Sequence, residues 1–212
     1  MMSRPKWGRS LQSIALWAGL ILLVGCAGQQ QRIASTPSPS AAESALANYR
    51  QPAAGLFTGG QPEQAEWQAL AAAGITTVIN LRGAEETPDR DEAAEVSAQG
   101  MRYLNIPVAG AADVNDATAD RLWWAIREAG GPVLVHCASG NRVGALLALG
   151  AYRNDDRAAA AALAFGQEAG LSRLEPVVRE RLDCRPPAAG DVADAGPSVA
   201  ASDHSGISCV GN

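Results

Sequence analysis

Lysine is almost absent from this chain of 212 residues, since Lys6 is its only one. No basic run follows the first ten positions, and the formal net charge is −5. An acidic chain gains nothing from displacing counterions at phosphates, so nucleic acid is not an expected partner. Aromatic residues are also scarce at 5%, but a hydrophobic share of 47% is that of a globular protein. We therefore expect one ordinary domain with extensions, and not a disordered chain.

Long apolar runs are lacking as well. The apolar stretch at residues 11–24 is shorter than the ~20 residues that a membrane-spanning helix needs. It follows Arg4, Lys6 and Arg9, and basic residues followed by an apolar stretch are typical of a secretory signal peptide. The residues Leu23–Cys26 resemble a bacterial lipobox, in which the cysteine is lipidated and becomes the first residue of the mature protein.

A lipobox implies that Cys26 anchors the mature protein to a bilayer. Ala27 follows it instead of aspartate, which in Gram-negative lipoproteins implies delivery to the outer membrane, facing the periplasm. The acyl chains of such a cysteine exceed what stable anchoring requires. An uncleaved membrane anchor with an incidental cysteine is the alternative interpretation.

Small and polar residues flank the central part of the chain. Residues 26–48 are rich in Gln, Ser, Pro and Ala, and they predict a flexible tether between the signal peptide at 1–25 and the domain. Residues 185–212 are rich in Ala, Gly, Asp, Ser and Pro, and they predict a disordered tail. The folded domain is therefore expected at residues 49–184.

Within this domain the apolar pattern alternates between strands and helices. Short apolar or β-branched runs predict strands at residues 55–58, 76–81, 102–108 and 132–136. Amphipathic or fully apolar segments predict helices at residues 62–74, 91–99, 117–129, 143–152, 155–168 and 173–183. This alternation predicts an α/β fold with a central, mostly parallel sheet of four to five strands flanked by helices.

The apolar strand at 132–136 leads directly into a loop of small residues, Cys137–Arg142, before an apolar helix. Loop amides and a helix N-terminus converge at such a junction and form an anion site, whose positive potential also favours the nucleophilic thiolate of Cys137. Gly140 permits the turn, and the planar fork of Arg142 can bind two oxygens of an oxyanion. A buried structural cysteine followed by a helix-starting arginine is the alternative.

The string His136-Cys137-x-x-Gly140 after an apolar strand resembles the catalytic loop of cysteine-dependent tyrosine and dual-specificity phosphatases. Upstream segments are similar to the phosphatase-like branch found beside or fused to β-lactamase-like hydrolases in bacteria: Thr58–Pro62, Val78–Arg82 with Glu85 and Glu86, and Tyr103–Val108. The resemblance covers about residues 52–170 and implies a phosphatase-like fold. Arg82, with Glu85 and Glu86 nearby, is expected to form a structural ion pair.

This resemblance implies hydrolysis of a phosphoester through a cysteinyl-phosphate. Cys137 would attack the phosphorus, while Arg142 and the loop amides stabilise the equatorial oxygens. The residues expected to bind the phosphate are Ala138, Ser139, Gly140, Asn141 and Arg142. The implied partner is a phosphorylated small molecule or a phosphoprotein, and the reaction requires no metal and no cofactor.

A general acid should protonate the leaving group, and in this family it comes from the loop before the helix that begins near Ala117. Asp113 and Asp116 are the candidates in that loop. Either Asn115 or Asp116 is expected to cap the helix, which favours Asp113 as the acid.

The loop departs from the tyrosine phosphatase pattern in two ways. Four residues instead of five separate Cys137 from Arg142, and Val143 stands where a hydroxyl residue commonly follows the arginine. Many rhodaneses share the four-residue spacing, but their cysteine carries a persulfide. A rhodanese-like sulfurtransferase and a catalytically inactive lipoprotein that binds an anion or a partner are therefore the alternatives to a phosphatase.

Overall fold

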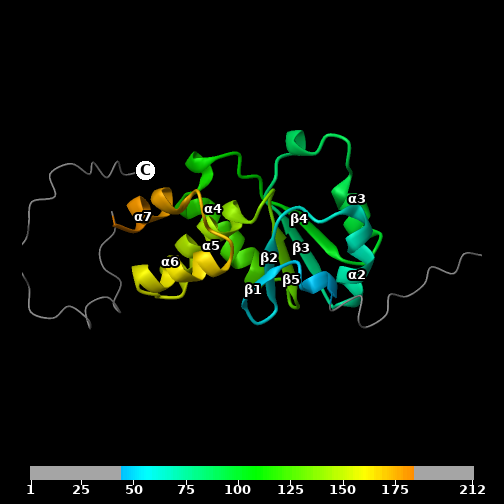
Figure 1. The fold of residues 1–212 in the computed structure, drawn as a ribbon, viewed down its shortest axis with the longest axis horizontal. Helices are drawn as coiled ribbons and strands as arrows, with labels where there is room; N and C mark the ends of the chain where they lie inside the picture. The colour runs from blue at the N-terminus through cyan, green and yellow to red at the C-terminus, as the bar shows by residue number, and fades with distance from the viewer. Residues whose placement is uncertain (1–43, 184–212) are drawn as a thin grey trace, which may run out of the picture. The chain divides into compact units, whose positions relative to one another are not determined.

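The computed structural model describes residues 44–183 of the chain (Figure 1). The predicted signal peptide, the predicted lipidation site at Cys26, nearly all of the predicted tether and the predicted tail lie outside these residues. Within the described part, no helix combines the length and the apolar character that crossing a membrane requires.

Among residues 44–183, five short strands form one sheet, and the predicted mostly parallel sheet is confirmed. In chain order the strands are β1 (Arg50–Ala53), β2 (Leu56–Gly59), β3 (Thr77–Asn80), β4 (Arg102–Asn105) and β5 (Val133–His136). The sheet order is β1-β2-β5-β3-β4, in which only β1 runs antiparallel to its neighbour. The sequence analysis did not predict β1, because its four residues carry no apolar alternation. Its Pro52 is tolerated because β1 is an edge strand.

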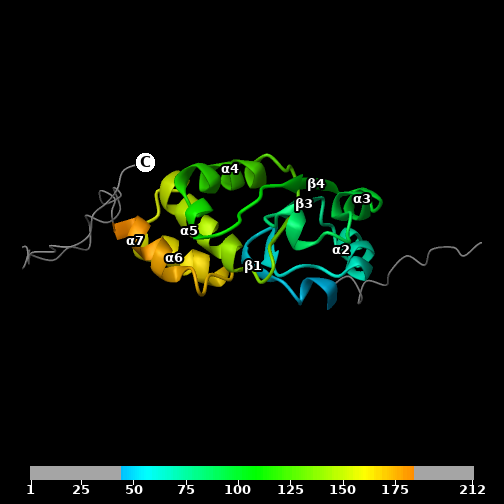
Figure 2. The same ribbon diagram turned by 90° about the horizontal axis from the view of Figure 1, so that it is seen from above.

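Helices cover both faces of the sheet, as Figures 1 and 2 show. One face carries α2 (Trp67–Ala72) and α3 (Glu92–Ser97), and the other carries α4 (Asp116–Arg127), α5 (Asn141–Asn154), α6 (Ala159–Glu168) and α7 (Glu175–Asp183). Three 3₁₀ turns lie in the connections, η1 (Gln64–Glu66), η2 (Ala84–Glu86) and η3 (Ala111–Asp113). The helix predicted from Pro62 thus begins as a 3₁₀ turn, and the other predicted helices agree within a few residues at each end.

The central strands are buried on both faces, which explains their apolar sequences. Val78 and Leu134 pack in the cluster on the α2 and α3 side, while Ile79 and Val135 pack in the cluster that contains α5. Ala45 is also buried, in the cluster with Val78, so packing begins a few residues ahead of position 49.

Glycines bring α5 and α6 into close contact. A Cβ added to Gly144 of α5 would overlap the backbone nitrogen of Leu171 and the carbonyl oxygen of Gly166. The same connection reaches the start of α5, where a Cβ on Gly170 would lie 3.1 Å from the carbonyl oxygen of Gly140. The packing of α5 against α6 and the following turn therefore fixes the position of the loop that precedes α5.

Candidate functional site

Cys137 lies directly after β5, at the carboxyl end of the strand between β2 and β3. Its side chain is buried, and its Sγ accepts a hydrogen bond of 3.2 Å from the backbone N–H of Gly140. Gly140 has a φ of +85°, in the left-handed region that glycine adopts without strain. The loop therefore turns back toward the sulfur and directs a backbone donor at it.

The amino end of α5 follows this turn. The N–H groups of its first turn, beginning with Asn141 and Arg142, have no partner within the helix and carry the positive end of its dipole. The side chain of Asn141 turns away from the sulfur, because its Oδ1 accepts hydrogen bonds from the N–H groups of Ser172 (2.8 Å) and Leu174 (3.2 Å). Asn141 can thus contribute its backbone amide to an anion, while its side chain fixes the helix start.

Arg142 makes a bidentate ion pair with Glu86. Its Nη1 lies 2.6 Å from Oε1 and its Nη2 lies 2.7 Å from Oε2, while Nη1 also donates to the carbonyl oxygen of Val108 at 2.6 Å. The hydrogen bond to Glu86, with a further contribution from the neighbouring Cys137, raises the pKa of Arg142 although burial opposes this. These contacts occupy one edge of the guanidinium, which also makes a side-chain hydrogen bond with Cys137. Nε–H and one Nη2–H therefore lie on the side of the guanidinium where an oxyanion at Cys137 could bind.

Glu86 in turn is held by Arg82. The Nε of Arg82 donates to Glu86 Oε2 at 3.1 Å, and its Nη2 donates to the carbonyl oxygen of Glu86 at 2.7 Å. The hydrogen bonds from Arg142, from the N–H of Gly83 and from Arg82 lower the pKa of Glu86 to about 2. The expected ion pair of Arg82 is confirmed, and its partner is Glu86. The sequence analysis missed that the same carboxylate orients Arg142.

Glu86→Gln should destabilise the fold by roughly 2 kcal/mol at pH 7, because an amide cannot accept two charge-assisted hydrogen bonds from Arg142. The pKa of Glu86 is about 2 in the folded protein against an ordinary value of 4.5. Its contribution is therefore fully present above pH ~4.5 and is lost as the pH falls toward 2.

Urea unfolding of wild type and Glu86→Gln at pH 7 and near pH 2.5 measures this effect. The difference in their free energy of unfolding should be smaller at the lower pH. Glu85→Gln is the matched control, since the neighbouring Glu85 is exposed. An equal difference at both pH values would contradict the charge argument.

His136 and Glu92 form a buried pair beneath the loop. His136 Nε2 lies 2.7 Å from Glu92 Oε1, and the two side chains are 0% and 4% exposed. Burial alone would raise the pKa of Glu92, but the hydrogen bonds from His136 and Gln61 and the charge of Arg90 lower it overall. Through this pair, His136 ties β5 to α3 immediately before the cysteine.

Asp113 lies in η3, in the connection between β4 and α4. Its Oδ2 accepts a hydrogen bond of 2.8 Å from the N–H of Ala109, the residue after Val108, whose carbonyl oxygen binds Arg142. Asn115 and Asp116 were the two residues expected to cap α4, and Asn115 is its N-cap. The Oδ1 of Asn115 accepts a hydrogen bond of 3.0 Å from the N–H of Thr118. Asp113 is therefore not the capping residue, and its loop begins beside the guanidinium.

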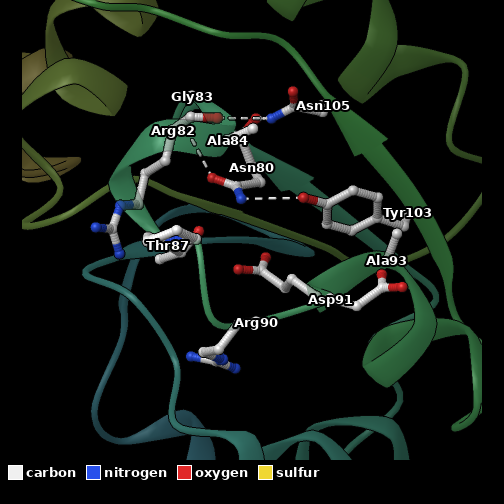
Figure 3. A pocket seen from close by; sticks show the side chains of 12 residues that line it. Asn80, Arg82, Gly83, Ala84, Thr87, Arg90, Asp91, Ala93, Tyr103 and Asn105 are labelled. Carbon is white, nitrogen blue, oxygen red and sulfur yellow. Dashed lines mark hydrogen bonds between the residues drawn. The ribbon is translucent and has the colours of Figure 1, made fainter.

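A polar cavity of about 300 Å³ opens beside this network (Figure 3). It lies between the carboxyl ends of β3 and β4, the connection after β3 and the start of α3, and it is lined by Asn80, Arg82, Gly83, Ala84, Thr87, Pro88, Arg90, Asp91, Glu92, Ala93, Tyr103 and Asn105. Figure 3 shows the side chain of Asn80 donating to the hydroxyl of Tyr103, at 3.0 Å. The lining shares Arg82 and Glu92 with the hydrogen-bond network and does not include residues 137–142.

The comparisons with known proteins agree with this architecture. The family model described as "Beta-lactamase hydrolase-like protein, phosphatase-like domain" matches residues 49–154. The chain belongs to this family. The matched residues run from the start of the sheet to the end of α5, so they include the cysteine loop, Arg142 and Glu86. The resemblance identified from the sequence is confirmed.

Relatives with the phosphatase-like domain include two beta-lactamase hydrolase-like proteins. The one from Agrobacterium fabrum is 35% identical over 99 residues, which are 45% of this chain and 23% of that protein. The one from Xylella fastidiosa is 36% identical over 98 residues, or 44% of this chain and 22% of that protein. The match thus spans less than a quarter of the length of these curated relatives.

Solved structures with the phosphatase-like fold resemble the chain over most of their own length. A candidate phosphatase from Neisseria meningitidis is 26% identical with a TM-score of 0.53, over 66% of this chain and 96% of that one. A candidate phosphatase from Shewanella putrefaciens is 25% identical with a TM-score of 0.51, over 64% and 86%. Pseudomonas aeruginosa TpbA, solved as a serine variant with phosphotyrosine, shares the fold at 21% identity and a TM-score of 0.51, over 68% and 85%.

Proposed function

We propose that this protein is a cysteine-dependent phosphatase that hydrolyses phosphoesters through a cysteinyl-phosphate. The arrangement of Cys137 and Arg142 carries this proposal. A sulfur that accepts a backbone N–H lies before a helix N-terminus, next to a guanidinium with one edge still available for an oxyanion. Membership of a phosphatase-like family and the similar solved structures support the same reaction.

The chemistry follows from these positions. The thiolate of Cys137 attacks phosphorus, so that an S–P bond forms and the bond to the leaving oxygen breaks. The amides of the Cys137–Arg142 loop and the free edge of Arg142 bind the equatorial oxygens, whose charge they stabilise in the transition state. Water then attacks the phosphorus and the S–P bond breaks, which releases inorganic phosphate and restores the thiolate.

The proposed site of action is the periplasmic face of a bacterial membrane, with the protein anchored through lipidated Cys26. The support for this part is the sequence alone, a basic and then apolar leader that ends in Leu23–Cys26. A phosphorylated small molecule or a phosphoprotein outside the cytoplasm is the proposed substrate, and the phosphotyrosine bound by TpbA makes phosphotyrosine a suitable first choice among natural esters.

Hydrolysis of para-nitrophenyl phosphate tests the reaction. The full chain, purified in detergent and kept reduced, should turn over this ester between pH 5 and 8 and be inhibited by vanadate. A chain that hydrolyses neither this ester nor phosphotyrosine would overturn the proposal. A gain of ~32 Da at Cys137 after incubation with thiosulfate would then support the sulfurtransferase, and binding without either reaction would support the inactive lipoprotein.

Asp113→Asn should lower kcat by about 10²-fold if Asp113 is the general acid, because the amide cannot donate a proton to the leaving oxygen. The loss should be greater for phosphotyrosine than for para-nitrophenyl phosphate, whose leaving group needs less protonation. The exposed Asp155, at the far end of α5, provides the control Asp155→Asn. An equal loss of kcat on both esters would show that Asp113 acts through its hydrogen bond with the N–H of Ala109 and not as the general acid.

A further inference from the structure

The side chain of Gln61 joins two ionised groups that come from different parts of the chain. Gln61 lies between β2 and η1, in the Thr58–Pro62 segment, whose role the proposed reaction leaves unexplained. Its Nε2 donates to Glu92 Oε2 at 2.7 Å, and its Oε1 accepts from Arg82 Nη1 at 2.8 Å. An amide can donate to a carboxylate and accept from a guanidinium at the same time, so both ends of this side chain are used.

These two bonds complete a continuous network. On one side, Glu92 binds His136, the residue before Cys137. On the other side, Arg82 has all of its donor nitrogens engaged, Nη1 on Gln61 and the other two on Glu86. Arg82 therefore holds the carboxylate that receives both Nη groups of Arg142.

We propose that Gln61 is a positioning residue of the phosphate site, which fixes the Arg82–Glu86 pair and through it the guanidinium of Arg142. This inference rests on the proposed function, because it assigns Arg142 to the oxyanion. Without Gln61, Arg82 Nη1 loses its acceptor and Glu92 Oε2 loses its donor in a largely buried region. Both groups then turn toward new partners, and Arg142 loses the fixed geometry that transition-state binding requires.

The first test is Gln61→Leu, which keeps a side chain of similar size. It removes the hydrogen bonds to Glu92 and Arg82 and a longer one, 3.3 Å, from Nε2 to the carbonyl oxygen of Pro62. We expect kcat for para-nitrophenyl phosphate to fall by about 10-fold with KM changed by less than ~3-fold, since the loss falls on transition-state stabilisation. The dissociation constant for orthovanadate should rise by a similar factor. Gln99→Leu is the matched control, because Gln99 is exposed at the end of α3. Circular dichroism establishes that each variant is folded.

The second test is Gln61→Glu, whose carboxyl group can replace the amide donor only when it carries a proton. Gln61 Nε2 lies 2.7 Å from Glu92 Oε2, so a carboxyl group in its place shares a proton with Glu92 at low pH and repels it at high pH. The ratio of wild-type to variant kcat should therefore rise from about 1–3 near pH 5 to about 10 near pH 8. The charged or titratable neighbours of this pair are Arg82, His136, Arg90 and Tyr103, and they are the same in both proteins. Gln99→Glu should give a ratio that does not change with pH.

The outcomes separate this inference from the proposed function. If wild type binds vanadate without hydrolysing any ester, the phosphatase proposal fails, and vanadate affinity alone decides the role of Gln61. If Gln61→Leu keeps the wild-type kcat and vanadate affinity, or the ratio for Gln61→Glu is flat with pH, the positioning role is overturned. If wild type neither binds vanadate nor turns over, both fail together, because there is then no oxyanion site to position. A Gln61→Leu variant that does not fold leaves Gln61→Glu as the deciding variant.

Discussion

Cys137→Ser is expected to lower the turnover of para-nitrophenyl phosphate by ~10³-fold or more. A serine hydroxyl stays protonated near neutral pH. Within residues 44–183, the hydrogen bond that Cys137 Sγ accepts comes from the N–H of Gly140, which stabilises a negative sulfur but does not remove a proton. His136, the adjacent residue, uses its Nε2 on Glu92. The proposed nucleophile is therefore lost in this variant, while the surrounding hydrogen-bond donors remain.

Binding of inorganic phosphate should change much less in the same variant. The first-turn amides of α5 and the free edge of Arg142 are unaltered by this substitution, so the dissociation constant measured by calorimetry should stay within about 3-fold of wild type. Cys209→Ser is the control for replacing a thiol as such. A Cys137→Ser protein with more than about a tenth of the wild-type turnover would show that another group performs the attack.

Gly144→Ala is expected to be the most destabilising single-methyl change in the domain, by about 3 kcal/mol or more. In an isolated helix the same replacement would stabilise by about 1 kcal/mol, because alanine loses less backbone entropy than glycine. Here the new Cβ would overlap the backbone of Leu171 and Gly166, and backbone atoms cannot rotate away. The helices must separate, and the turn that supports Gly140 moves with them.

Gly150→Ala in the same helix is the matched control. Its Cβ would meet the ring of Trp123 at 2.8 Å, and a half-buried side chain can shift where a backbone cannot. We expect the free energy of unfolding of this variant to fall by no more than about 1 kcal/mol. Urea unfolding of this variant, wild type and Gly144→Ala measures the change. Equal losses for the two variants would show that the contact between α5 and α6 is more adaptable than its geometry indicates.

The fold was predictable because its signals are local. The buried strands β3 and β5 are recognisable in the sequence as apolar, β-branched runs, and α5 is recognisable as a helix that is apolar on all sides. The missed strand, β1, has no such signal: its pairing depends on the neighbouring β2, and its own residues are mostly exposed. The cysteine loop was also recognisable, because a strand end, a small-residue turn and a helix start occupy consecutive positions.

The partners of the loop were not predictable from the sequence, because they are long-range and polar. Glu86 and Arg142 are 56 positions apart in the sequence, and Glu92 and His136 are 44 positions apart, yet the members of each pair form hydrogen bonds. Glu85 and Glu86 follow Arg82 closely in the chain, so the sequence left open which of them would bind an arginine. Charged residues near a strand end are also usually solvated. The amide of Gln61 carried no local signal of its two partners.

The sequence by itself determined the alternation of strands and helices, the family and the position of the cysteine loop, since these follow from hydrophobic periodicity and from a contiguous motif. Only the tertiary structure decided how the arginine is held. The parallel order β2-β5-β3 brings the carboxyl ends of three strands to one edge, so that Gln61, Arg82 and Cys137 follow neighbouring strands in space although they are distant in the chain. Ion pairs and amide bonds form wherever the chain brings partners within ~3 Å, and that proximity is a property of the packed sheet.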